Sequence, residues 1–296
     1  MQFQHVHNEL TDKTEIAIIK KYDYIAKCYT VTLMIFGICA IFAFMAFQFW
    51  INMINFALPA NVSRSYNFLI MMEYFIDQDT YFYLIILHTT LATCIGTISG
   101  VACSTLFLTF VQHSCGMLKI ASYRIEHAIN MNIKRNVMPE NEILMTKGIS
   151  YAVDIHRQAL KLNKHLLSIV ETMLLSFLLF LVLCLSLNLF RLMICKNIKY
   201  IVVPLGCVGV CTIYMFFFNL LGQIVTDHNN DVFITTYNVY WYRTPCHIQR
   251  MILFLLQKGI KEFHFNIGGI FDISIEGFTT LVKTSVSYFT VISSIQ

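Results

Sequence analysis

The sequence predicts an all-α integral membrane protein, a polytopic helical bundle with five transmembrane helices. Of its 296 residues, 57% are hydrophobic and 13% are charged, and the mean hydropathy is +0.63. A soluble domain normally has about a quarter charged residues. The apolar residues gather into five runs, each long enough for a helix to cross the roughly 30 Å hydrocarbon core of a bilayer. Together these observations exclude a soluble protein.

The placement of the polar and reactive side chains excludes several further functions. The net charge is +4, but the basic residues are spread over the loops, which is not the pattern of a protein that binds nucleic acid. Most of the ten cysteines lie inside apolar runs without a Cys-x-x-Cys pair, so we expect small buried side chains and no metal. The apolar runs contain neither a nucleophile nor a pair of carboxylates that would indicate an intramembrane enzyme. We therefore expect no cofactor and no catalytic residue.

Residues 1–112 are expected to form a polar, helical lead-in and the first two crossings. The lead-in has charges of both signs and no basic, cleavable signal, so the first crossing must also direct insertion into the membrane. That crossing, 29–52, is free of charge. The second, 82–112, contains Gly96 and Gly100 at a spacing that lets a neighbouring helix approach closely.

The loop 53–82 between these crossings is expected to face the outside of the cell. It contains three acidic residues and a single basic residue, Arg64. Basic residues are enriched in cytoplasmic loops, so this loop has the composition of an external one. Asn61 begins an Asn-Val-Ser triplet, an acceptor for N-glycosylation, which agrees with that placement.

The rest of the chain alternates between basic and apolar segments. Residues 113–168 are polar and basic and are expected to form a cytoplasmic helical anchor segment. Two crossings follow in 169–225. Residues 226–270 form a second cytoplasmic anchor segment with an amphipathic helix at 246–258, and 271–296 make the final crossing. The N-terminus is then cytoplasmic and the C-terminus extracellular.

The final segment has two different faces at helical spacing. One face mixes hydroxyls with branched aliphatic side chains: Leu281, Thr284, Tyr288, Val291 and Ile295. The other face is apolar throughout. Two interpretations are open at this point. The helix could line an aqueous path, or it could be an ordinary member of the bundle whose hydroxyls bond to neighbouring helices.

Three separated motifs resemble those of insect odorant receptors. Residues 283–291 resemble the family's final helix. Residues 237–242 have the pattern Tyr-Asn-x-x-Trp-Tyr and are followed by Pro245, and residues 113–119 are similar to a His-x-Cys-Gly-x-Leu-Lys motif of the family. Because the three occur in the family's order and span most of the chain, they are more specific than any one alone.

The resemblance implies a fold, a function and partners. The five crossings resemble helices three to seven of the seven-helix family, so the first two helices have no counterpart, and we expect a fragment in preference to a degenerate member. Members are ligand-gated, non-selective cation channels in the plasma membrane of olfactory sensory neurons. A tuning subunit binds a small volatile odorant and assembles with a co-receptor into a heterotetramer, in contact with membrane lipid.

The resemblance also assigns residues to the channel. Carried over by position, Val291 matches the hydrophobic gate and Ile295 lies one helical turn further outward. Thr284 and Tyr288 would line the wider path below the gate. An apolar ring closes such a pore by dewetting.

The odorant pocket is expected in the outer half of the bundle. On the first crossing, small residues beneath a large indole leave space for an apolar molecule, and residues of the next crossing and the fourth complete the wall. The candidates are Ala43, Ala46, Phe47, Trp50, Tyr83, Leu87 and Val208. The competing interpretation is that these side chains are ordinary packing residues.

Three alternatives to an odorant receptor were considered. A gustatory receptor is similar in fold and gating, but its last helix has a Thr-Tyr-x-x-x-x-x-Gln-Phe pattern, where this chain has Ser293-Ser294 in place of Gln-Phe. A membrane transporter would need an intramembrane nucleophile, paired carboxylates or a metal cluster, whereas Glu171 lies at a helix edge and His88 is alone. A G-protein-coupled receptor has the opposite orientation.

Overall fold

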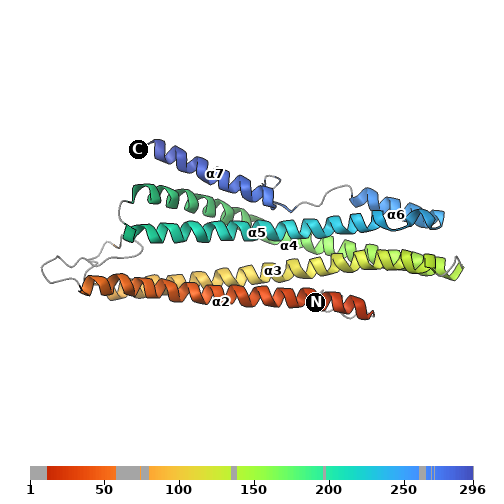
Figure 1. The fold of residues 1–296 in the computed structure, drawn as a ribbon, viewed down its shortest axis with the longest axis horizontal. Coiled ribbons are helices and arrows are strands. Elements are labelled where there is room, and N and C mark those ends of the chain that lie inside the picture. Colours follow the sequence, from red (N-terminus) through yellow and green to blue (C-terminus); the bar gives the residue numbers. More distant parts are fainter. Residues whose placement is uncertain are drawn as a thin grey trace. The chain divides into compact units, whose positions relative to one another are not determined.

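The fold is built almost entirely of helices (Figure 1). It divides into two compact units. The computed structural model describes residues 12–57, 74, 80–134, 139–195, 198–259, 265–267, 269 and 271–295. One unit is Tyr24–Thr109, and the other joins Met1–Asp23 to Phe110–Gln296. Each unit is described by itself.

The unit Tyr24–Thr109 is a pair of helices from α2 (Lys13–Ala57) and α3 (Phe82–Lys134). Gly37 of α2 makes the close approach, since a Cβ there would lie 2.9 Å from Val101 Cγ2. At Gly96 and Gly100, where the sequence predicts an approach, an added Cβ would meet nothing within 4 Å in the described part of the chain. The close approach expected at Gly96 and Gly100 of α3 is therefore wrong for this unit. The glycine that permits the packing is Gly37, on α2.

The second unit is dominated by α4 (Pro139–Ile194) and α5 (Ile198–Asn238), which run antiparallel. Contacts fix this direction: His156 bonds to Asn229, whereas Phe177, further along α4, packs on Tyr214, earlier in α5. The 56 residues of α4 span roughly 84 Å at 1.5 Å per residue. This is more than twice the thickness of a hydrocarbon core, so a large part of α4 lies outside the apolar region.

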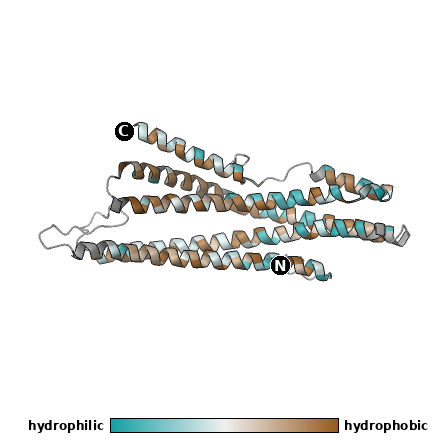
Figure 2. Cartoon of the chain, viewed as in Figure 1, coloured by the Kyte–Doolittle hydropathy of each residue, from teal (hydrophilic) through white to brown (hydrophobic). Residues whose placement is uncertain are grey.

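In the part of the chain that the structure describes, four helices are long and apolar enough to cross a membrane, and apolar residues colour much of their length in Figure 2. The four segments lie in α2, α3, α4 and α5 and overlap the first four expected crossings: Lys13–Trp50, Phe82–Asn130, Glu142–Ile194 and Ile201–Asn238. The last helix, α7 (Ile275–Ser294), is fully described and is not among them. Its many hydroxyls make it too polar for this group.

A first core, the anchor core, fills the polar end of the second unit. It consists of buried side chains from the start of α2, α3, α4, α5 and α6 (Cys246–Gly259). In α6 the buried residues are Ile248, Ile252 and Leu256, at four-residue spacing, whereas Leu253 and Phe254 are exposed. The amphipathic helix expected at 246–258 therefore lies with its apolar stripe on this core.

The segment before α7 is a short hairpin, which corrects the helix expected over 271–296. β1 (Asn266–Ile267) pairs antiparallel with β2 (Phe271–Asp272), and Gly269 between them has a φ of +69°. Helix α7 begins only at Ile275, because extended Ser274 caps it by accepting a bond from the Gly277 N–H at 3.0 Å. An apolar run alone does not separate a short strand from a helix.

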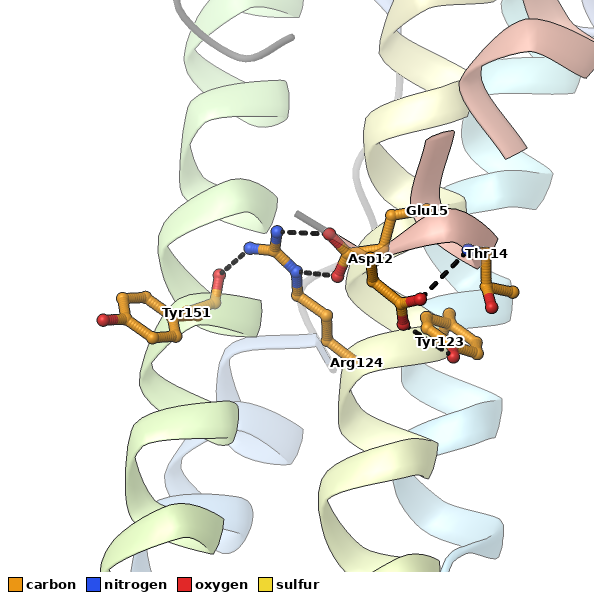
Figure 3. A network of polar contacts seen from close by, with 6 residues as sticks. All are labelled: Asp12, Thr14, Glu15, Tyr123, Arg124 and Tyr151. Carbon is orange, nitrogen blue, oxygen red and sulfur yellow. Dashed lines mark hydrogen bonds and ion pairs between the residues drawn. The ribbon is translucent and has the colours of Figure 1, made fainter. Parts of the chain in front are cut away.

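A polar network ties the start of α2 to α3 and α4 (Figure 3). The Arg124 guanidinium donates from Nε and Nη2 to the two carboxylate oxygens of Glu15, at 2.6 and 2.9 Å. It also donates from Nη1 to the Tyr151 carbonyl at 3.3 Å. Glu15 is buried, so this bidentate pair is a strong, shielded contact.

Asp12 completes the network as the cap of α2. The Thr14 N–H donates to Asp12 Oδ1 and the Tyr123 hydroxyl to Oδ2, each at 3.0 Å. The bond from the Thr14 backbone, followed by that from Tyr123, lowers the pKa of Asp12 below its ordinary value. The resulting stabilisation is complete above the ordinary aspartate pKa and is lost as the pH falls through the lowered one.

We predict that Glu15→Ala lowers the free energy of unfolding by about 3 kcal/mol, because it leaves a largely buried guanidinium without its carboxylate. Thermal unfolding in detergent would measure the change. Glu126→Ala is the matched control, since Glu126 is an exposed carboxylate two residues beyond Arg124 on α3. Equal midpoints for the two variants would contradict the structural role of the pair.

Candidate functional site

Helix α7 packs on the second unit through one face of its first half. Phe278 and Leu281 contact a second core, here called the α7 cluster, formed by Leu181, Val182, Leu185, Cys211 and Met215 of α4 and α5. The Phe278 ring also meets Phe216 edge-on, with 5.5 Å between centroids. On α7 itself, Gly277 and Ser285 are buried. Phe278, from the face expected to be apolar, and Leu281, from the mixed face, are thus both turned to the bundle at this end.

The start of α7 is held against α5 at two glycines. A Cβ on Gly222 would collide with the carbonyl oxygen and side chain of Ile273. A Cβ on Gly277 would collide with the Asp272 carbonyl and lie 3.1 Å from Asn219 Oδ1. Only glycine permits this approach at both positions. The sequence analysis missed this joint, because nothing in the sequence separates these glycines from the others.

Of the four residues assigned to the channel, Thr284, Tyr288 and Val291 lie on α7, and Ile295 follows directly as its C-cap. Tyr288 is 51% exposed, Val291 56% and Ile295 80%. Thr284 is half-buried. Within one chain this face of the helix therefore has little packing.

A hydroxyl-rich face lies beside these residues, and the sequence analysis did not single it out. Its exposed polar residues follow one another at helical spacing: Glu276, Thr280, Lys283, Ser287, Thr290 and Ser294. Several hydroxyls donate to carbonyls of α7 itself, Thr280 to Glu276 at 3.1 Å and Thr290 to Ser287 at 2.7 Å among them. Each such oxygen keeps its lone pairs for other partners. These polar residues are three or four positions apart in the sequence, and that spacing could have predicted a shared helix face.

The candidate pocket residues are divided between the two units. Ala43, Ala46, Phe47, Trp50, Tyr83 and Leu87 are in Tyr24–Thr109, where all but the half-buried Phe47 are exposed. Val208 is in the other unit and packs on the α7 cluster. Neither unit alone brings the seven together. Asn61 lies outside the described residues.

The motif at 237–245 makes the turn between α5 and α6. Trp241 begins the short 3₁₀ helix η1 (Trp241–Arg243) and packs on the anchor core. Tyr240 and Tyr242 are exposed, and the Arg243 guanidinium lies over both rings, 5.5 and 5.9 Å from their centroids. The motif at 113–119 lies within α3, where Gly116 packs on Tyr22.

Comparison with known proteins identifies the family. The family model described as 7tm Odorant receptor matches residues 1–286, almost the whole chain. The chain belongs to the insect odorant receptor family. No curated protein matches this receptor. The match favours the odorant family over the gustatory and transporter alternatives, and it ends before Tyr288, Val291 and Ile295.

Solved structures show the same fold. The insect olfactory receptor OR5 from Machilis hrabei in complex with eugenol has a TM-score of 0.67 to this receptor at 13% sequence identity. OR5 without that ligand gives a TM-score of 0.62, also at 13% identity. Both alignments cover 95% of this receptor and 69% of OR5. At this identity, the likeness establishes the fold alone.

The receptor is therefore a multi-pass membrane protein of a family that forms odorant-gated cation channels and is not enzymatic. Its helical bundle is the insect odorant receptor fold.

We predict that Gly222→Ala destabilises the receptor by about 1–3 kcal/mol, because the new methyl group meets the Ile273 backbone, which cannot move like a flexible side chain. The measurement is the midpoint of thermal unfolding. Gly206→Ala, on the same helix, is the control: its methyl group meets nothing within 4 Å in the described structure, so helix propensity should leave stability equal or higher. A loss of similar size in both variants would refute the joint.

Proposed function

We propose that this receptor is the tuning subunit of an odorant-gated, non-selective cation channel in the plasma membrane of olfactory sensory neurons, and that α7 lines its pore. The observation that carries the proposal is the division of α7 into two faces. Phe278 and Leu281 pack on the bundle, while Thr280, Ser287 and Ser294 are exposed. Lipid is a poor environment for such a hydroxyl face, whereas an aqueous path satisfies it.

The gate is proposed at Val291 and Ile295. Both are exposed apolar residues in the last turns of α7, beside the hydroxyl face. In a closed ring of four subunits, side chains of this kind exclude water and ions without a charged barrier. Thr284 and Tyr288, one to two turns earlier, line the wider path.

The proposed partners are a co-receptor, in a heterotetramer, and membrane lipid. The anchor segments 113–168 and 226–270 carry the subunit contacts. In support, Tyr240, Tyr242 and Phe254 are exposed although they lie beyond the apolar span that ends at Asn238. Exposed aromatic residues outside the lipid-facing surface are typical of protein interfaces.

The proposed ligand is a small volatile odorant, in line with the eugenol bound to the similar OR5. Its pocket would use Ala43, Ala46, Phe47, Trp50, Tyr83, Leu87 and Val208. The N-terminus is proposed to be cytoplasmic and the C-terminus extracellular, supported by the basic residues of 113–168, with Asn61 outside.

The function is tested by expressing the receptor with a co-receptor in cells and recording whole-cell current during application of a panel of volatile compounds that includes eugenol. We predict a reversible inward cation current with at least one compound. Cells with the co-receptor alone are the control. Surface-expressed receptor that adds no response to any compound would overturn the tuning role.

The gate is tested by Val291→Ser, which makes the proposed ring polar. We predict a current without odorant several times that of the unaltered channel, because a polar ring no longer dewets. Val286→Ser is the matched control, since Val286 is also an exposed valine on α7 but points to a different side. If both variants gave the same resting current, Val291 would not be the gate.

A further inference from the structure

Helix α7 consists of a packed half and a projecting half. From Ile275 to Ser285 it contacts the α7 cluster and the joint at Gly222. From Val286 to Ile295 every residue is exposed or half-buried, and none is buried. Figure 1 shows α7 inclined to α4 and α5. The change falls at Ser285, the last buried residue of the helix.

At this residue α7 receives a hydrogen bond from another helix. The buried hydroxyl of Ser186, on α4, donates to the Ser285 carbonyl oxygen at 2.9 Å. The Ser285 hydroxyl itself donates to Leu281 of its own helix, also at 2.9 Å. Two small side chains therefore let α4 and α7 approach closely, and the bond between them is shielded from solvent.

The Ser186 hydroxyl has a second acceptor at nearly the same distance. The carbonyl oxygen of Val182, one turn earlier on α4, lies 2.8 Å away. A hydroxyl has one proton, so it can donate to either oxygen by rotating. When the bond to Ser285 breaks, the proton still has a partner in Val182. The usual cost of leaving a buried donor unsatisfied is then avoided, and the contact can open and close readily.

We propose that Ser186 is the positioning residue of α7. Its hydroxyl fixes only the end of the packed half, at Ser285, on α4, and so sets the point about which residues 286–295 turn. The joint at Gly222 and Gly277 keeps the start of the helix in place, so a change of angle at Ser285 moves Val291 without moving Ile275. The role of this motion in gating rests on the proposed function. The turning point at Ser285, here called the hinge, does not depend on it.

The hinge is tested on the purified full-length receptor by electron paramagnetic resonance, without any measurement of current. Spin labels are attached through an introduced ketone-bearing amino acid, because the chain has ten cysteines of its own. One label replaces Ile213, exposed on α5, and the second replaces Thr290 in the projecting half or Thr279 in the packed half.

We predict that Ser186→Ala raises the population of displaced Thr290 positions about fivefold, the effect of losing one net hydrogen bond, and leaves the Thr279 distances unchanged. Ser186→Thr keeps a hydroxyl and should restore the original distribution. Ser176→Ala is the matched control, since among the described residues the Ser176 hydroxyl bonds to Met173 of its own helix.

Two results would overturn the proposal. In the first, Ser186→Ala leaves the Thr290 distances as they are in the Ser176→Ala control. In the second, the Thr279 and Thr290 distances broaden together, which would mean that the whole helix loosens from the joint. Either result would leave the channel function itself untouched, because no conduction is measured.

Discussion

The polarity of α7 constrains the rest of the structure. A helix with Glu276, Lys283 and a row of hydroxyls is too polar to be surrounded by lipid, yet Phe278 and Leu281 need an apolar neighbour. The bundle supplies that neighbour through the α7 cluster and holds the helix at Gly222 and Ser186. The two requirements together fix which face of α7 packs on the bundle and which remains exposed.

The elements that depend on local sequence could be predicted. The apolar runs of α2 to α5 mark their helices, and the four-residue spacing of Ile248, Ile252 and Leu256 marks α6. The hairpin before α7 could not be predicted, because Phe271 and Ile273 continue the apolar pattern of the helix, and the strand forms through its pairing with Asn266–Ile267.

Features that join distant residues were also beyond the sequence. Arg124 and Glu15 are 109 residues apart, and neither lies in a motif. The close approach at Gly222 depends on the backbone of Ile273, and at Gly37 on a valine of another helix. For the pocket, periodicity indicates which residues share a helix face, but not how Val208 lies with respect to Trp50, since they belong to different units.

Helices α4 and α5 run without interruption between the two cores of the second unit. In α4, Ile149 and Ile155 belong to the anchor core, while Leu181 and Leu185 belong to the α7 cluster. In α5, Val232 belongs to the anchor core and Met215 belongs to the α7 cluster. A rod of this kind responds to hydrophobic mismatch by tilting as a whole. The acyl-chain length of the surrounding lipid therefore acts on the ends of these helices in the anchor core as well as on their apolar spans.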